Sequence, residues 1–443
     1  MTPAPVSGWR LWAFAGINLP LMALTIAVMV HLPRYFASHL GLPLAVVGAA
    51  FAIVRFIDIP LDPLLGLAMD RTRTRLGRYR AWALAGAPVL MLGVFVLTSA
   101  TAGSQAFLVA WLFVMYLGLS MQGLAHASWA STLAPTYDQR SQVFGVITAV
   151  GVIGAAIVLI IPVVAAQTGA TDAQGVQAMA GFVIAATPVF TLLALWKTPE
   201  RVMSDHAEGG FALKDYLGLI VRPNVIRLLC ADLLIRLGPL WMGALYLFFA
   251  KDSRGFSTTQ ANLLLLIYMM AGFAGAPLTA LAAKRFSKHR TLMATTTAYA
   301  ACMALLMTLP KGSFIAFAPF LFATGALAAG FDVTVRAITA DIGDELRLDS
   351  GREWMGLLFA LTNASIKIAG AVSIFVTFLA LDAVGYDAGE GAANTASAIR
   401  GLEIAFLSGP ILSVLIGGAC FIGFRLDAAR HAEIRAALEA RGV

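Results

Sequence analysis

The stretch Arg55 to Arg80 reads RFIDIPLDPLLGLAMDRTRTRLGRYR. Its first half belongs to a long apolar run, yet it carries Arg55, Asp58 and Asp62. The spacing i, i+3, i+7 puts these three side chains on one face of a helix. A charge inside a membrane span costs at least ~2.5–3.5 kcal/mol and is usually functional. Two carboxylates one turn apart, beside a guanidinium, therefore form a candidate site for a cation or a proton.

The second half of this stretch is a basic loop. Its arginines follow one another closely: Arg71, Arg73, Arg75, Arg78 and Arg80. Loops rich in lysine and arginine stay on the cytoplasmic side of a membrane. The stretch therefore predicts a membrane span that ends in the cytoplasm.

The whole chain has the composition of an integral membrane protein. Of its 443 residues, 59% are hydrophobic and 12% are charged, whereas soluble domains average about 25% charged residues. The net charge of +7 comes from loops between apolar runs, where it sets orientation and meets anionic lipid. We therefore expect the lipid bilayer as a partner and no nucleic acid. Cys230, Cys302 and Cys420 lie far apart in apolar segments and suggest neither a metal site nor a disulfide framework.

Apolar runs of span length recur about twelve times along the chain. Basic loops follow the second, sixth and eighth runs, and the C-terminal tail is basic too. Because such loops stay inside, we expect both termini in the cytoplasm and a multi-pass protein of the plasma (inner) membrane. The predicted spans are 11–31, 43–69, 81–100, 105–134, 141–166, 177–196, 225–250, 259–283, 291–309, 313–341, 353–381 and 400–424.

The polar stretch 197–224 divides the chain into two halves. A basic loop follows the second span of each half, at 70–80 and 284–290, so the halves resemble a distant repeat. We predict an all-α protein with an N-terminal six-helix bundle over 1–196, a cytoplasmic linker over 197–224 and a C-terminal six-helix bundle with a basic tail over 225–443. Twelve spans in two bundles around a midplane cavity are typical of the major facilitator superfamily fold.

Further polar side chains lie inside the predicted spans. Asp232 and Arg236 are spaced i, i+4, as are Asp332 and Arg336, so we expect each pair to neutralise itself along its own helix. His126 is either a proton carrier or a satisfied interior donor. The candidate residues of the cavity are Asn18, Arg55, His126, Trp129, Asp232, Arg236, Asp332 and Arg336.

A second charged stretch, 340–353, is predicted to connect spans ten and eleven. It is either a solvated loop or part of a cytoplasmic gate that faces the arginine loop after span two. The candidate gate residues are Asp70, Arg71, Arg75, Arg78, Asp341, Asp344 and Glu345. Lys367 follows about four turns into span eleven, too deep to reach the membrane surface easily, so it needs an anionic partner or a hydrated cavity. We expect that partner to be Asp58 or Asp62.

Two motifs resemble the glycoside–pentoside–hexuronide:cation symporters, the family of the melibiose permease. One is R-x-x-D-x-x-x-D-P-x-x-G in span two, continued by D-R-T-R-T-R-x-G-R-x-R, and it is matched from Arg55 to Arg80. The other is A-D-x-x-D-E, matched from Ala340 to Glu345, followed by the lysine of span eleven. The resemblance implies that Asp58 and Asp62 serve a coupling cation, Na⁺, Li⁺ or H⁺, and that Lys367 lies close to them.

This chain departs from the family at two places. The charged residues that bind galactosides in the melibiose permease are replaced by Asn18, Ala125 and Thr148, and Trp129 is kept. A tyrosine–threonine pair near the cation site becomes Met121 and Gln122. Gln122 is a candidate that offers a carbonyl oxygen to Na⁺ at Asp58 and Asp62, but the thinner oxygen shell favours H⁺.

The sequence as a whole predicts a monomeric secondary transporter, with cation-coupled symport of a small polar solute by alternating access. The alternatives are transport of a lipid-like amphiphile such as a lysolipid, drug export, and a sensor that does not transport. No G-x-x-x-x-G-K-[ST] sequence occurs, so the ion gradient is the expected energy source, with no cofactor. A membrane enzyme is not expected, because G-x-S-x-G, H-E-x-x-H and clustered Cys/His ligands are all missing.

Overall fold

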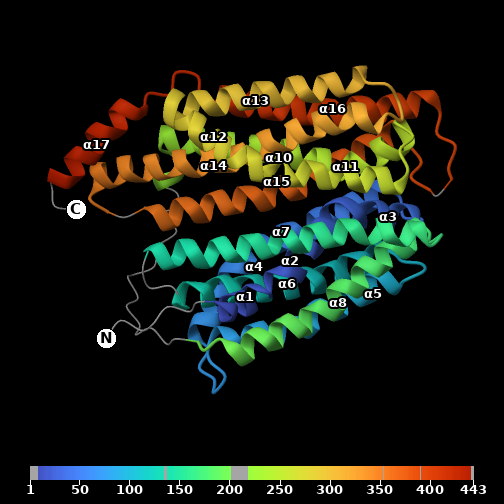
Figure 1. Cartoon of the computed structure of the whole chain (residues 1–443), viewed down its shortest axis with the longest axis horizontal. Helices are drawn as coiled ribbons and strands as arrows, with labels where there is room; N and C mark the ends of the chain where they lie inside the picture. Colours follow the sequence, from blue (N-terminus) through green and yellow to red (C-terminus); the bar gives the residue numbers. More distant parts are fainter. Residues whose placement is uncertain (1–7, 134–136, 201–217, 353, 390, 441–443) are drawn as a thin grey trace. The chain divides into compact units, whose positions relative to one another are not determined.

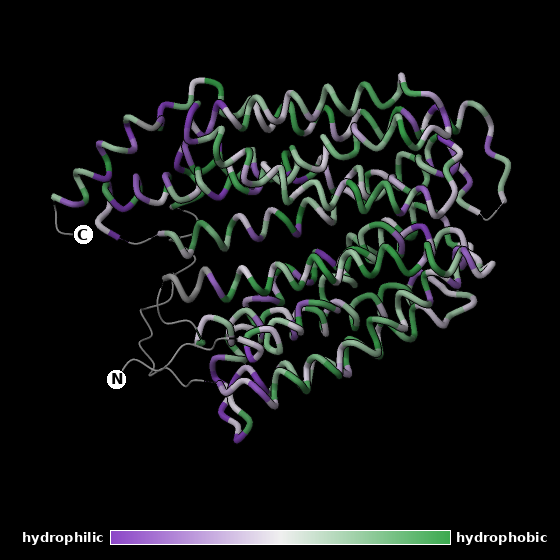
Figure 2. Tube along the Cα trace, in the orientation of Figure 1, coloured by the Kyte–Doolittle hydropathy of each residue, from purple (hydrophilic) through white to green (hydrophobic). Residues whose placement is uncertain are grey.

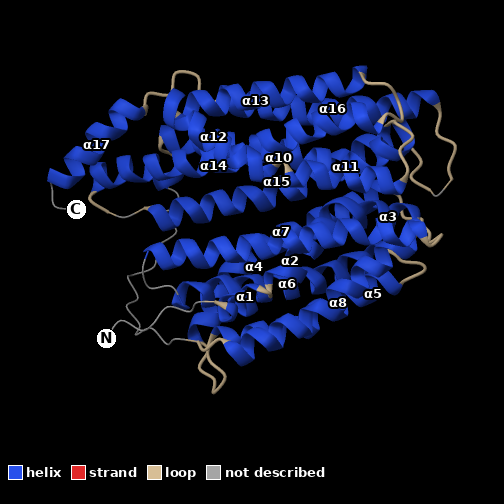
Figure 3. Cartoon of the chain, viewed as in Figure 1, coloured by secondary structure: helices blue, strands red, loops and turns tan. Residues whose placement is uncertain are grey.

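The computed structural model describes residues 8–133, 137–200, 218–352, 354–389 and 391–440, and in these ranges the regular structure is helical, with no strand (Figure 3). Twelve helices of the described chain are long and apolar enough to cross a membrane. Figure 1 shows these helices running alongside one another within each part of the chain. The prediction of an all-α protein with twelve spans is confirmed, and the chain is a multi-pass integral membrane protein.

The first six spans are formed by residues 9–197. The first span is interrupted, because α1 ends before Gly16 and a π-helical turn, η1, separates α2 from α3. The elements are α1 (Trp9–Ala15), α2 (Asn18–Ile26), η1 (Ala27–His31), α3 (Leu32–Ser38), α4 (Leu44–Arg71), α5 (Tyr79–Ser99), α6 (Gln105–Leu133), α7 (Tyr137–Gln167) and α8 (Asp172–Lys197).

The other six spans are formed by residues 223–419, and a short amphiphilic helix follows them. The elements are α10 (Pro223–Phe248), η2 (Phe249–Ser253), α11 (Thr258–Met270), α12 (Gly272–Phe286), α13 (Lys288–Leu305), η3 (Leu306–Thr308), α14 (Phe314–Ser350), α15 (Met355–Ala383), α16 (Ala396–Ala419) and α17 (Ala428–Ala440).

The chain divides into two compact units. The domain bounds 1–196 and 225–443 stay a prediction, as does the linker 197–224, of which 201–217 lie outside the described residues. Unit 1 comprises Met1–His206, Ser257–Leu263 and Ile374–Thr395, and unit 2 comprises Ala207–Phe256, Leu264–Ser373 and Ala396–Val443.

The surfaces and helix contacts follow from a lipid environment. Large apolar side chains lie exposed on the helices, among them Leu64 (63%), Leu192 (55%) and Ile315 (84%). Figure 2 shows hydrophobic residues along the helices and hydrophilic ones gathered near their ends. Between α5 and α6 the backbones approach closely at Gly93 and Gly118, where a Cβ atom would collide with Met115 and Leu90. Small residues permit such contacts between spans, and this contact holds α6 in place for the site in unit 1.

One predicted boundary is wrong. The tenth span was expected to end at 341, but α14 continues to Ser350 and ends at Gly351, which takes the left-handed conformation with φ 67°. The helix continues because no proline or glycine follows Gly343 before Gly351, and glycine adopts a left-handed helix terminus at little cost. Asp341, Asp344 and Glu345 therefore lie on a helix rather than in a loop.

Candidate functional site

The centre of the site in unit 1 is the buried carboxylate of Asp58 on α4. Only 2% of the residue is exposed. Ser120 on α6 donates its hydroxyl to Asp58 Oδ1 at 2.9 Å, and Arg55 Nη1 lies 3.5 Å from Oδ2. The Arg55 guanidinium also lies 4.2 Å from the centre of the Tyr116 ring, which is a cation–π distance. The partners of this carboxylate in the membrane span thus include a hydroxyl and a cation.

Asp62 lies one helical turn beyond Asp58, where α4 passes through two prolines, Pro60 and Pro63. The side chain is half-buried and its Oδ1 atom is enclosed. Proline cannot donate a backbone hydrogen bond, so the carbonyl oxygens four residues before Pro60 and Pro63 lose their usual helical partner. Carboxylate, hydroxyl and carbonyl oxygens are ligands that suit a proton or a hard cation such as Na⁺.

The side chain that α6 presents to Asp58 is Ser120 and not Gln122. These two residues are two positions apart, which places them about 200° apart around a helix. Gln122 is fully buried on another face, where its Nε2 donates to the Ala83 carbonyl and to Thr191 Oγ1, both at 3.1 Å. In this conformation Gln122 ties α6 to α5 and α8. The i, i+4 spacing of Tyr116 and Ser120 places both side chains on one face of α6. The sequence analysis missed this spacing, which marks the face that contacts Arg55 and Asp58.

Three candidates for the cavity pack between helices instead. Asn18 Nδ2 donates to the Ile147 carbonyl at 2.9 Å and joins α2 to α7. His126 is buried, and its Nε2 lies 3.0 Å from the carbonyl oxygen of Phe14 near the break between α1 and α2. The Phe14 ring also contacts Trp129 edge to face, at 5.0 Å between centroids, and Trp129 has no exposed surface. This geometry fits a satisfied interior donor for His126 and a packing role for Asn18 and Trp129.

Unit 2 has its own charged cluster, which joins α10 to α14. Arg236 Nε donates to Asp232 Oδ1 at 2.6 Å, and its Nη1 donates to Asp332 Oδ1 at 2.6 Å. We expected Asp332 and Arg336 to neutralise each other along one helix. This expectation is wrong, because Asp332 pairs with Arg236 on another helix instead. Asp232 is fully buried, whereas the Asp332 side chain is 53% exposed. Since an exposed carboxylate in a span is costly against lipid, this side of unit 2 is expected to face water.

Arg336 is exposed on α14, four residues after Asp332, and Lys367 is half-buried within α15. Lys367 belongs to unit 2, whereas Asp58 and Asp62 belong to unit 1. The pairing of Lys367 with either aspartate stays a prediction.

At the ends of α4 and α5 in unit 1, the basic loop folds around an acidic residue that the sequence analysis missed. The carboxylate of Glu200 accepts hydrogen bonds from the backbone N–H groups of Arg78, Tyr79 and Arg80, at 2.9–3.1 Å. It therefore caps α5, whose first amide groups have no partner within the helix. Asp70 accepts a hydrogen bond from the Tyr79 hydroxyl at 2.9 Å, while Arg71 and Arg75 are exposed.

The acidic residues near the end of α14 have partners within unit 2. Asp341 lies 2.6 Å from Lys288 Nζ and 3.3 Å from His431 Nε2. Asp344 lies 3.0 Å from the same histidine nitrogen, on α17. Glu345 accepts from Asn224 Nδ2 at 2.7 Å. A gate in which these carboxylates face the arginines of unit 1 stays a prediction, and any such gate would compete with these contacts.

Known proteins resemble this chain over nearly its whole length. The isoprimeverose transporter of Lactiplantibacillus pentosus is 24% identical over 420 residues, which cover 90% of this chain and 85% of that protein. The uncharacterized symporter YjmB of Bacillus subtilis (strain 168) is 22% identical over 424 residues, 91% of this chain and 89% of that protein. A crystal structure of the nucleoside transporter NupG (D323A mutant) shares the fold with a TM-score of 0.71, at 11% identity, over 94% of this chain and all of that one.

These relatives and neighbours are transporters rather than enzymes. They confirm the expected major facilitator fold and the resemblance to the glycoside–pentoside–hexuronide:cation symporters. The family model described as "MFS/sugar transport protein" matches residues 13–428. The chain therefore belongs to the MFS/sugar transport protein family of membrane transporters.

Proposed function

We propose that this protein is a cation-coupled symporter of a sugar or glycoside that works by alternating access, with both termini in the cytoplasm. The observation that carries the proposal is the buried Asp58 carboxylate within a membrane span, with Ser120 and Arg55 as partners. A carboxylate in this position is costly unless a positive charge neutralises it, and such residues commonly mark the path of an ion. The names of the relatives, which include an isoprimeverose transporter and a lactose permease of Leuconostoc lactis, support a sugar as the solute.

Arg55 gives the coupling a physical basis. It already lies 3.5 Å from Asp58, so an incoming H⁺ or Na⁺ competes with it for the carboxylate. When Asp58 is neutralised, the guanidinium loses its counter-charge and becomes available to a hydroxyl group of the solute. Solute binding then favours the cation-loaded carrier, and by linkage the cation favours solute binding to the same extent.

The second charged cluster suits the sugar side of the reaction. Arg236 and the exposed Asp332 present both donors and acceptors on a face of unit 2 that we expect to be hydrated. Sugar hydroxyls donate and accept hydrogen bonds, and a site built from such groups rejects solutes that lack them. We therefore assign the solute contacts of unit 2 to Asp332 and Arg236, with Arg336 as a neighbour on α14.

The experiment is uptake of radiolabelled isoprimeverose and lactose into proteoliposomes, with an imposed proton gradient or an imposed Na⁺ gradient. We expect one of the two gradients to drive accumulation. Asp58→Asn should lower accumulation at least tenfold but preserve solute exchange, because exchange does not require release of the cation. Asp62→Asn is the second variant, and the conservative Asp58→Glu should keep part of the activity.

Accumulation that follows the ion gradient unchanged in both asparagine variants would remove these aspartates from the mechanism. Uptake of a lysolipid, with no uptake of either sugar, would replace the sugar proposal by its rival.

A further inference from the structure

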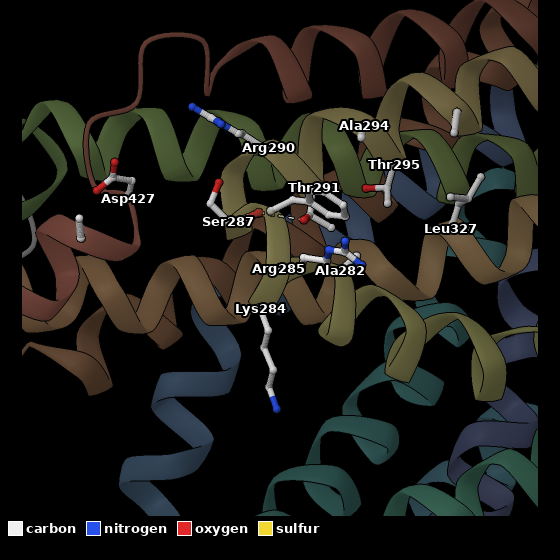
Figure 4. Close-up of a pocket in the computed structure, with 13 residues that line it drawn as sticks. Ala282, Lys284, Arg285, Ser287, Arg290, Thr291, Ala294, Thr295, Leu327 and Asp427 are labelled. Atoms are coloured by element: carbon white, nitrogen blue, oxygen red, sulfur yellow. Dashed lines mark hydrogen bonds between the residues drawn. The ribbon is translucent and has the colours of Figure 1, made fainter.

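We propose that unit 2 carries a binding site for an anionic phospholipid, in the pocket where α12 turns into α13. The pocket has a volume of about 800 Å³ and lies beside the first residues of α17. Figure 4 shows it with its lining residues. It lies apart from the Asp232–Arg236–Asp332 cluster in the chain and shares no lining residue with it.

The mouth of the pocket is positively charged. Lys284 and Arg285 end α12, and Arg290 lies in the first turn of α13. All three side chains are exposed and line the pocket, with Asp427 as a single carboxylate on its wall. In Figure 4, Lys284 and Arg290 extend to opposite sides, and Arg285 lies nearer the hydroxyl groups of α13. The charges sum to a net +2 from three cations and one anion, which favours a phosphate group over a neutral or positive one.

A row of hydroxyl groups continues the polar part of the wall. Ser287, Thr291 and Thr295 are spaced i, i+4, i+8, so they lie on one face at the start of α13 and all line the pocket. The Oγ atom of Ser287 is buried and has no hydrogen-bond partner among the described residues. Buried polar groups usually have a partner, so the Ser287 hydroxyl is a donor that the described residues leave unused in this wall.

The inner wall changes from polar to apolar. Ala294 lies beside Thr295, and Ala298 on α13 and Leu327 on α14 also line the pocket. Ala298 is eight residues after Arg290, which corresponds to about 12 Å along a helix. Cationic groups at the end of the spans and an apolar channel about two turns deeper match the order of headgroup and acyl chain in a lipid.

The position in the fold supports a lipid rather than a soluble phosphate. The pocket lies at the turn between two membrane spans, α12 and α13. Phe286, which also lines it, is 60% exposed, so an apolar ring lies beside the cationic side chains. Basic pockets between spans on the cytoplasmic side bind anionic headgroups. The occupant that fits charge, depth and position together is an anionic phospholipid such as phosphatidylglycerol or cardiolipin.

Native mass spectrometry of the full-length protein in detergent tests this site. Phosphatidylglycerol, phosphatidylcholine and glycerol phosphate are added in graded amounts, and the lipid-bound fraction is measured. We expect phosphatidylglycerol to bind at least fivefold more tightly than phosphatidylcholine, and glycerol phosphate not to bind measurably. Arg285→Ala should abolish the preference. Its control, Arg430→Ala, removes an equal charge from the exposed face of α17 and should preserve it.

A second variant tests the channel without a change of charge. Ala294→Leu adds bulk to the wall of the pocket and should weaken phosphatidylglycerol binding at least fivefold, whereas Thr297→Leu, on the same helix but not among the residues that line the pocket, should not. The variants are compared only where their helical circular dichroism matches the parent protein.

Equal binding of phosphatidylglycerol and phosphatidylcholine, or normal binding by both Arg285→Ala and Ala294→Leu, would overturn the proposal. Tight binding of glycerol phosphate would show a site for soluble phosphate instead. Because the lipid comparison needs no variant, the proposal stays falsifiable if a variant fails to fold.

Discussion

Each unit carries an arginine and two aspartates in its membrane spans, but the two sets of charges are arranged differently. In unit 2, Arg236 makes contacts of 2.6 Å with both carboxylates and joins two helices. In unit 1, Arg55 and Asp58 lie on the same helix, and their closest atoms are 3.5 Å apart. Hydrogen bonds between charged groups are normally about 2.7–2.9 Å long. The arginine of unit 2 is therefore locked in place, whereas the arginine of unit 1 is held loosely.

This difference matches two separate tasks. A coupling site has to exchange its counter-ion in every cycle, so a long contact with an arginine on the same helix suits it. A site that orients a solute benefits from rigid partners, because an organised site loses less entropy when the solute binds. We therefore assign cation exchange to Asp58 and orientation of the solute to the cluster around Arg236. The predictions below test this division.

The largest effect is expected from Arg236→Leu. The substitution leaves Asp232 buried without its cation, and removal of one partner from a buried pair typically costs ~3–5 kcal/mol. We expect a large decrease in the apparent melting temperature of the detergent-solubilised protein, measured by tryptophan fluorescence. Arg222→Leu, directly before the first residue of α10, is the matched control, since the pair of Arg222 with Asp349 is exposed and such pairs contribute about 0–1 kcal/mol.

The double variant Arg236→Leu/Asp232→Asn lacks the uncompensated charge. Its apparent melting temperature should therefore lie between those of Arg236→Leu and the parent protein. If Arg236→Leu melts like the parent protein, then the cluster of unit 2 is no tighter than that of unit 1, and the comparison fails.

A smaller effect is expected from Ser120→Ala, at the coupling site. The substitution removes the hydroxyl that donates to Asp58 at 2.9 Å. The Ser120 oxygen is also a candidate ligand for a metal cation, and a hydrogen bond to a charged group contributes about 1.5–3 kcal/mol, so loss of the hydroxyl should weaken the binding of a metal cation at Asp58. The measurement is the cation dependence of sugar uptake. Under Na⁺ coupling the half-saturating Na⁺ concentration should increase roughly tenfold.

The control is Ser131→Ala on the same helix, whose hydroxyl donates to the Ser128 carbonyl within α6. A cation dependence that is unchanged in Ser120→Ala would show that this contact does not tune Asp58.

The architecture could be predicted from the sequence because it depends on local signals. A charged stripe at i, i+3, i+7 and a basic loop after it identify a span and its end without knowledge of any partner helix. The same signals identified Asp58, Arg55 and Asp232 as unusual, since charges in spans are rare. Their partners could not be predicted in the same way. Whether Asp332 contacts Arg336 or Arg236 depends on how α14 is rotated against α10, and one sequence does not contain this information.

The surroundings of other candidate residues could not be predicted for the same reason. Gln122 was chosen because it replaces a residue of the related family near the cation site, but one helix presents residues 120 and 122 to different neighbours. Asn18 and His126 were chosen as candidates because buried polar groups are conspicuous in an apolar sequence. Their partners are backbone carbonyls of other helices, which no pattern of side chains reveals. The same reason hides Glu200, whose partners are backbone N–H groups.

The smallest effect is expected from Glu200→Ala, at the end of unit 1 where α5 begins. The Glu200 carboxylate accepts hydrogen bonds from three successive backbone N–H groups, and loss of a helix cap typically costs about 0.5–2 kcal/mol. We expect a modest decrease in melting temperature and faster hydrogen exchange confined to residues 72–82. Glu433→Ala is the control, because its pair with Arg430 is exposed on α17. If hydrogen exchange at 72–82 stays as slow as in the parent protein, then the basic loop keeps its structure without Glu200. In that case the other contacts of the loop, such as that of Asp70, are sufficient to hold it, and the cap does not stabilise it further.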